Sequence, residues 1–168
     1  MAPVMDEDQF WSFIGELGGS TDEPSMHRLW LRLRRTDDPE LILDFYDRLC
    51  EVLHRLDRRE IAKQRWRSTE QPWWAPRMPG ISADGFLYAR CAAVAEGRQT
   101  VEAVLRDSRA FRRRWSWGEE LLFVAPKAYE ATARREFPYD RDTAYSYETG
   151  SNPDGGWKRA GSPPGNPQ

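Results

Sequence analysis

Apolar side chains recur at intervals of three and four residues along most of this chain, and no segment shows sustained alternation of apolar and polar residues. Intervals of three and four place side chains on one face of an α-helix, whereas a half-buried strand requires a period of two. Phe10, Ile14 and Leu17 follow the helical spacing near the N-terminus. The pattern predicts an all-α fold, with five to seven helices in a single domain over residues 5–137.

Capping residues divide the pattern into separate helices. The first helix is predicted between Asp6 and Gly18-Gly19, the second begins at Thr21 or Asp22, and the third begins at residues 36–39. Asp and Thr side chains accept hydrogen bonds from the free N–H groups of a first turn, and Pro fits that turn. Gly favours the end of a helix because it adopts the left-handed conformation.

The second half of the chain is predicted with more interruptions. We expect the third helix to fade over residues 55–67, and Pro72, Pro76 and Pro79 to make residues 68–81 a loop. The helices expected after it cover residues 82–97, 100–105, 117–124 and 126–135. The break before Pro126 is expected because the residue preceding a proline avoids the α conformation. The residues expected in the core are Phe10, Ile14, Leu29, Trp30, Phe45, Leu49, Val52, Phe86, Val94, Leu105, Leu122 and Tyr129.

Residues 138–168 differ in composition, since they hold ten of the 24 Gly and Pro residues of the chain. A segment with few apolar residues cannot offset the entropy lost on ordering by itself. We expect an irregular tail that either stays mobile or lies along the domain through its aromatic side chains.

Charge and hydropathy exclude several classes of partner. Acidic residues number 27 and basic residues 25, so the net charge of −2 argues against nucleic acid and anionic membrane surfaces. The longest apolar run, residues 121–125, is far shorter than the roughly 20 residues needed to cross a bilayer. The acidic N-terminus is unlike a secretory signal, so we expect a cytoplasmic protein with no membrane partner. The dominance of Arg over Lys indicates a GC-rich, bacterial genome.

No nucleophile, metal or cofactor motif is present in the sequence. Cys50 and Cys91 lack a CxxC spacing and are expected to be buried, inert thiols. His27 and His54 stand alone, so we expect no metal site, and the missing glycine-rich loops predict no cofactor. Whether the chain catalyses a reaction stays open at this point.

Five residues form one candidate site for a small ligand: Asp84, Tyr88, Arg90, Glu119 and Glu120. Arg90 would orient an anionic ligand, and Asp84 would act as a base or amine anchor. The simpler interpretation of Asp84 and the two glutamates is stabilisation of helix N-termini by negative charge. The first interpretation predicts a small tailoring enzyme or a small-ligand-binding protein.

Tryptophans that lie near arginines in the sequence form the second candidate site. Trp73 and Trp74 lie in the proline-containing loop, near Trp66 in sequence, and Trp115 follows an Arg-rich connection. Such pairs hold single-stranded nucleic acid in some proteins, but the negative net charge favours a protein or peptide partner, for which Arg and Trp supply hot spots. We therefore predict a non-enzymatic protein- or peptide-binding or regulatory module with one exposed tryptophan patch. Its oligomeric state stays open.

Three stretches together resemble a known family. Its first pattern, M-D-x-x-x-F-W, is similar to residues 5–11. Its middle pattern, S-D-D-G-F-x-Y-F-R, is similar to the start of residues 82–98, where Tyr88 and Arg90 lie. Its last pattern, E-x-L-x-Y-V-A-P-x-A-Y, is similar to residues 119–130. This small bacterial family is described as domain of unknown function 4240, and the resemblance spans roughly residues 5–135. It implies a mostly helical cytoplasmic domain without established activity, and it supplies no catalytic residue. Ala83 replaces the first Asp of the middle pattern, and the proline-broken residues 68–80 replace an apolar helix.

Overall fold

The computed structural model describes residues 5–64, 67–68, 72–74, 81–112, 114–115 and 118–158. Within them lie seven α-helices: α1 (Glu7–Ile14), α2 (Glu23–Arg34), α3 (Pro39–Leu56), α4 (Arg59–Ala62), α5 (Ala83–Glu96), α6 (Arg98–Arg106) and α7 (Leu121–Ala133). Two 3-10 helices, η1 (Gly15–Leu17) and η2 (Ser108–Arg112), and two short strands, β1 (Arg67–Ser68) and β2 (Arg114–Trp115), complete the described elements. The strands pair in parallel over two residues, with Arg67 opposite Arg114. The predicted all-α fold is confirmed.

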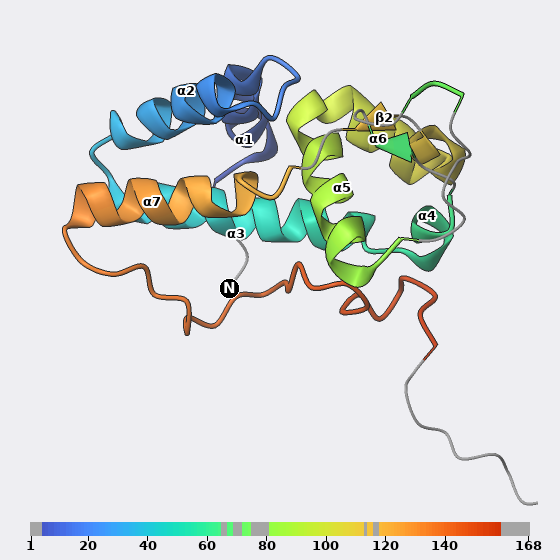
Figure 1. Cartoon of the computed structure of the whole chain (residues 1–168). Coiled ribbons are helices and arrows are strands. Elements are labelled where there is room, and N and C mark those ends of the chain that lie inside the picture. The colour runs from blue at the N-terminus through green and yellow to red at the C-terminus, as the bar shows by residue number, and fades with distance from the viewer. Residues whose placement is uncertain are drawn as a thin grey trace, which may run out of the picture.

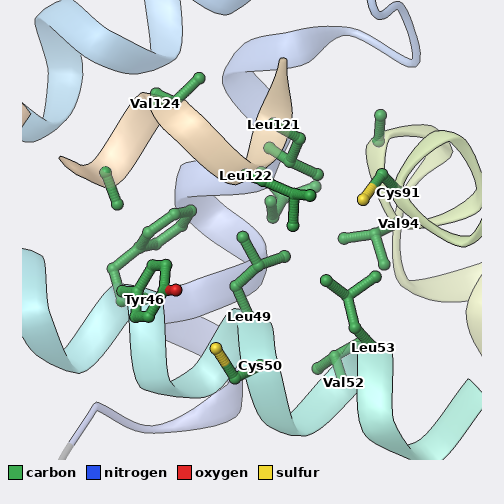
Figure 2. Packing of buried hydrophobic residues seen from close by; sticks show 14 of the residues in the cluster. Tyr46, Leu49, Cys50, Val52, Leu53, Cys91, Val94, Leu121, Leu122 and Val124 are labelled. Atoms are coloured by element: carbon green, nitrogen blue, oxygen red, sulfur yellow. The ribbon is translucent and has the colours of Figure 1, made fainter. Parts of the chain in front are cut away.

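The longest helix, α3, forms the base on which α1, α5, α6 and α7 pack. Helix α7 lies along α3 and is covered on its other side by α2, while α5 crosses near the C-terminal end of α3 (Figure 1). Figure 2 shows where the three helices meet: Leu121 and Leu122 of α7 point toward Leu49 of α3 and toward Cys91 and Val94 of α5. The site described below borders this core, since Val124 of α7 belongs to the buried cluster and also lines the site.

The helices begin where the capping residues predict. The carboxylate of Asp6 accepts from the Gln9 N–H at 2.7 Å, and that of Asp22 accepts from the Ser25 N–H at 2.8 Å. The Ser82 hydroxyl accepts from the Gly85 N–H at 3.0 Å. Each bond satisfies an N–H group that has no partner inside its own helix. These local rules therefore set the starts of α1, α2 and α5.

Most predicted core residues are buried. Ten of the twelve lie in the buried cluster, whereas Trp30 and Leu105 are only partly buried and pack against its edge.

The predicted helix break at Pro126 is wrong, because α7 continues through it. Pro126 is buried inside α7 and cannot donate to the Leu122 carbonyl, a defect that costs about 3 kcal/mol in an exposed helix. The flanking Leu122 and Tyr129 are buried as α7 packs between α2 and α3. Tertiary packing therefore outweighs the local preference against an internal proline.

The expected fading of α3 is replaced by a sharp turn. Helix α3 ends at Leu56, Asp57 leaves the helical conformation with φ −74° and ψ 72°, and α4 begins at Arg59. Asp57 is completely buried, although it stands in a run of charged residues. Its partners come from the C-terminal part of the chain.

Residues 138–158, here named the strap, are irregular but docked. The strap runs back past α3 and α5, as the orange and red trace in Figure 1 shows. The Arg141 guanidinium pairs with both carboxylate oxygens of Asp47, at 2.9 and 2.8 Å, and the Trp157 indole donates to the Asp57 carbonyl at 3.0 Å. Of the two alternatives for the tail, these residues follow the second: Tyr147 and Trp157 pack against the core, and charged groups add hydrogen bonds to the aromatic contacts. Residues 159–168 lie outside the described part.

We expect Gly118→Ala to destabilise the fold through the contact between α5 and the turn before α7. A Cβ atom at Gly118 would lie 2.5 Å from the Ala92 nitrogen and 2.9 Å from the Cys91 carbonyl carbon, both of which are backbone atoms. Overpacking of this kind costs about 1–3 kcal/mol, which urea denaturation measures.

Gly15→Ala is the matched control. Gly15 has helical φ and ψ, and no atom lies within 4 Å of the place that an alanine methyl group would take, so alanine there should raise stability by about 0.4–1 kcal/mol. Equal stability of the two variants would contradict the close approach at Gly118.

Candidate functional site

An open groove of about 760 Å³ lies between α2 and α7. Its lining residues are Glu23, Pro24, Met26, His27 and Trp30 from α2, with Glu120, Val124 and Lys127 from α7 and its N-cap. The volume is within the range of about 300–1,000 Å³ that is usual for ligand sites. The lining is mostly apolar, with charged groups at the rim.

Helix α2 supplies one wall because its sequence gives it two different faces. Leu29 and Leu33 point into the core and are fully buried. Glu23, His27 and Trp30 follow at intervals of four and three, so they share a second face. The His27 ring stacks on Trp30 at 5.5 Å between centroids, and the Arg34 guanidinium lies 5.2 Å from the Trp30 ring. These contacts hold the indole in place at the groove.

Helix α7 supplies the other wall. The Lys127 ammonium lies 3.4 Å from the Glu120 carboxylate, and both side chains are about two-thirds exposed, at 63% and 65%. Exposed pairs of this kind contribute at most about 1 kcal/mol, so a competing charge can displace either partner. Lys127 also lies 6.0 Å from the ring centre of Phe123, which is 39% exposed on the outer face of α7.

Three of the predicted site residues come together away from this groove. Asp84 is exposed in the first turn of α5, and Tyr88 lies one turn later on the same side of the helix. A hydrogen bond to Glu119 raises the pKa of Tyr88, with smaller contributions from burial and from the negative charges of Glu119 and Asp84. Asp84, Tyr88 and Glu119 therefore share one electrostatic environment. Glu120, the next residue, faces the α2–α7 groove instead.

Arg90 does not share a surface with Asp84. The two positions are about 120° apart around the axis of α5, and Arg90 is completely buried whereas Asp84 is exposed. Its guanidinium donates to the Leu53 carbonyl at 2.8 Å, and to the Tyr147 carbonyl and Thr149 hydroxyl at 3.0 Å each. Burial lowers the pKa of Arg90, and the nearby Asp57 charge opposes that shift. The hydrogen bonds that the Arg90 guanidinium donates therefore go to acceptors of its own chain.

The predicted tryptophan patch of Trp66, Trp73, Trp74 and Trp115 lies only partly within the described residues. Trp73 and Trp74 are 78% and 70% exposed, as a docking surface requires. Trp66 and the side chain of Trp115 lie outside the described part of the chain. A single patch formed by all four rings stays a prediction.

The cysteines are buried free thiols, as expected. Burial raises the pKa of both Cys50 and Cys91 to about 12, so neither forms appreciable thiolate at neutral pH. Among the described residues, no three His, Cys, Asp or Glu side chains gather in a way that would hold a metal ion. The described helices also include none with the length and apolar character needed to cross a membrane.

Sequence reasoning found Glu120 of the groove but missed its other polar residues, Glu23, His27 and Lys127. The repeated spacing of Glu23, His27 and Trp30 was an available signal, since it marks a second face on α2. Asp57 carried no such signal, because its partners lie more than 90 residues away in the sequence.

Comparison with known families gives a match over most of the chain. The family model described as protein of unknown function (DUF4240) matches residues 5–131, which is more than half of the chain. No curated protein and no solved structure matches. The matched range includes the α2–α7 groove, Asp57 and Arg90, and it ends before the strap.

We expect Glu119→Gln to lower the pKa of Tyr88 toward that of an ordinary tyrosine. The substitution removes the negative charge that disfavours the phenolate, while an amide oxygen can still accept the hydroxyl hydrogen. An NMR titration of the tyrosine ring carbons measures the pKa. Glu120→Gln is the matched control, since Glu120 lines the groove and should leave the pKa of Tyr88 unchanged. The same pKa in both variants would contradict the pairing of Tyr88 with Glu119.

Proposed function

The chain belongs to the DUF4240 family of proteins of unknown function, and we propose that it is a non-enzymatic module that binds a protein or peptide in the α2–α7 groove. The observation that carries the proposal is the groove itself, with its apolar floor and charged rim. Its setting under this proposal is a bacterial cytoplasm, in keeping with the Arg-rich composition and the two free cysteines.

The shape of the groove favours a peptide over a small molecule. Small-molecule sites enclose most of the surface of their ligand, whereas this groove is open to solvent between two helices. Apolar anchors of a bound helix fit such grooves at intervals of three, four and seven residues. Met26, Trp30 and Val124 supply the complementary apolar floor.

The charges at the rim favour a basic residue in the partner. Two carboxylates, Glu23 and Glu120, line the groove against one ammonium group, Lys127. The exposed pair of Lys127 with Glu120 is weak enough for an incoming Arg or Lys to replace it. The occupant is therefore an amphipathic segment that carries an apolar anchor and a neighbouring basic side chain.

The second candidate, a small tailoring enzyme or small-ligand-binding protein around Asp84 and Arg90, has less support. Tyr88 and Glu119 do lie with Asp84, but the bonded donors of Arg90 are occupied by Leu53, Tyr147 and Thr149. An anionic ligand would have to displace the strap to reach Arg90.

Peptide-display selection on the purified full-length chain tests the proposal. We expect enriched peptides to pair an aromatic or aliphatic residue with Arg or Lys. Trp30→Ala should weaken binding of a selected peptide about tenfold or more, which is about 1.4 kcal/mol, because it removes the largest apolar side chain that lines the groove. Fluorescence anisotropy of the labelled peptide measures the affinity.

Trp74→Ala is the matched control, since Trp74 is 70% exposed and is absent from the groove. It should leave the affinity unchanged. If the selected peptides bind Trp30→Ala normally but lose affinity for Trp74→Ala, the binding site is the loop that contains Trp73 and Trp74, and the groove proposal is wrong.

A further inference from the structure

The helices from α1 to α7, here called the helical body, bury two charged side chains. The hydrogen-bond partners of these side chains come largely from the strap. Asp57 and Arg90 are both 0% exposed. The Asp57 carboxylate accepts from the Gly150 N–H with one oxygen and from the Asn152 N–H with the other, each at 3.0 Å. A buried charge without hydrogen-bond partners is strongly unfavourable, so Asp57 requires an occupant at this position.

Arg90 contacts the strap in the same way, through neutral groups. Its guanidinium donates to the Tyr147 carbonyl and to the Thr149 hydroxyl, at 3.0 Å each. The Thr149 hydroxyl in turn donates to the Ala83 carbonyl at 2.8 Å. The buried Nε atom of Arg90 has no hydrogen-bond partner among the described residues. The two charges therefore recognise mainly the backbone of the strap, as receptors for extended peptides do.

Four positions of the strap add selectivity for sequence. Gly150 has φ +87°, a conformation that other residues rarely adopt. A Cβ atom at Gly155 would lie 2.3 Å from the Asp57 carbonyl oxygen. The Asn152 amide donates to the His54 carbonyl, and the Trp157 indole donates to the Asp57 carbonyl, both at 3.0 Å. The site fits the sequence Gly-x-Asn-x-x-Gly-x-Trp, which residues 150–157 provide.

We propose that Asp57, Arg90 and the His54 carbonyl form a peptide-recognition site that the strap fills within its own chain and that accepts the same strap from a second copy of this chain. The matched family region contains the site and ends at residue 131, so receptor and ligand are separate parts of the sequence. Exchange between copies preserves every contact, because the donors and acceptors are identical. The proposal is independent of the α2–α7 groove.

The test uses the full-length Gly155→Ala chain and a labelled peptide of residues 145–158 with the natural sequence. The added methyl group prevents the variant's own strap from seating against Asp57, while the peptide retains Gly155. We expect saturable binding of the peptide to this variant by fluorescence anisotropy, and at least about tenfold weaker binding to the natural chain, whose site is occupied.

Two controls define the site. Pro153→Ala, at an exposed strap position, should behave as the natural chain does, because it leaves the strap seated. Adding Asp57→Asn to Gly155→Ala should abolish binding, since the amide cannot accept both strap N–H groups with two oxygens. Equal peptide binding with and without Asp57→Asn, or no binding to a folded Gly155→Ala chain, would overturn the proposal.

Circular dichroism checks that each variant is folded. If Gly155→Ala fails to fold, Trp157→Ala replaces it, because it removes one donor and a half-buried ring without adding a clash. The same binding results are expected. Loss of folding in both variants would overturn the proposal, since the strap would then be an inseparable part of the core.

Discussion

The buried guanidinium of Arg90 is the interaction on which the arrangement of this chain depends. A cation removed from water must find acceptors, and α5 places Arg90 where the described helices supply one hydrogen-bond acceptor for it, the Leu53 carbonyl. The remaining acceptors come from Tyr147 and Thr149. This requirement explains how a segment rich in Gly and Pro becomes ordered without regular secondary structure. The order of the strap is dictated by the body, not by its own composition.

The groove has a different origin, namely the two-faced character of α2 and α7. On α2, Leu29 and Leu33 are buried in the core, whereas Trp30 lies on the side that lines the groove. On α7, Leu121 belongs to the core and Val124 reaches the floor of the groove. The two helices pack against each other, and the groove lies between them. Packing of one face therefore creates the hollow beside the other.

Local rules predict the parts of the fold that depend on neighbouring residues. Asp6, Asp22 and Ser82 cap helices as expected, because a cap needs only the next three residues. At Pro126 a local rule fails: a proline is expected to break a helix, but α7 continues because it packs between α2 and α3. The residues next to Pro126 in the sequence give no sign of that packing. Asp57 and Arg90 are beyond local reasoning for the same reason. Of the groove, the sequence indicates only Glu120, and it assigns Trp30 to the core because large apolar residues on a helical stripe are usually buried.

The separation in sequence between Arg90 and its acceptor has a consequence for biosynthesis. Thr149 follows Arg90 by 59 residues. At a translation rate of about 5–20 residues per second, about 3–12 s pass between the synthesis of the two. During that interval the Arg90 guanidinium can bond to the Leu53 carbonyl and to water, and its contacts with the strap can form only after the helices around it have been made. The strap is therefore made after the helices on which it docks, and its residues lie outside the matched range that contains Asp57 and Arg90.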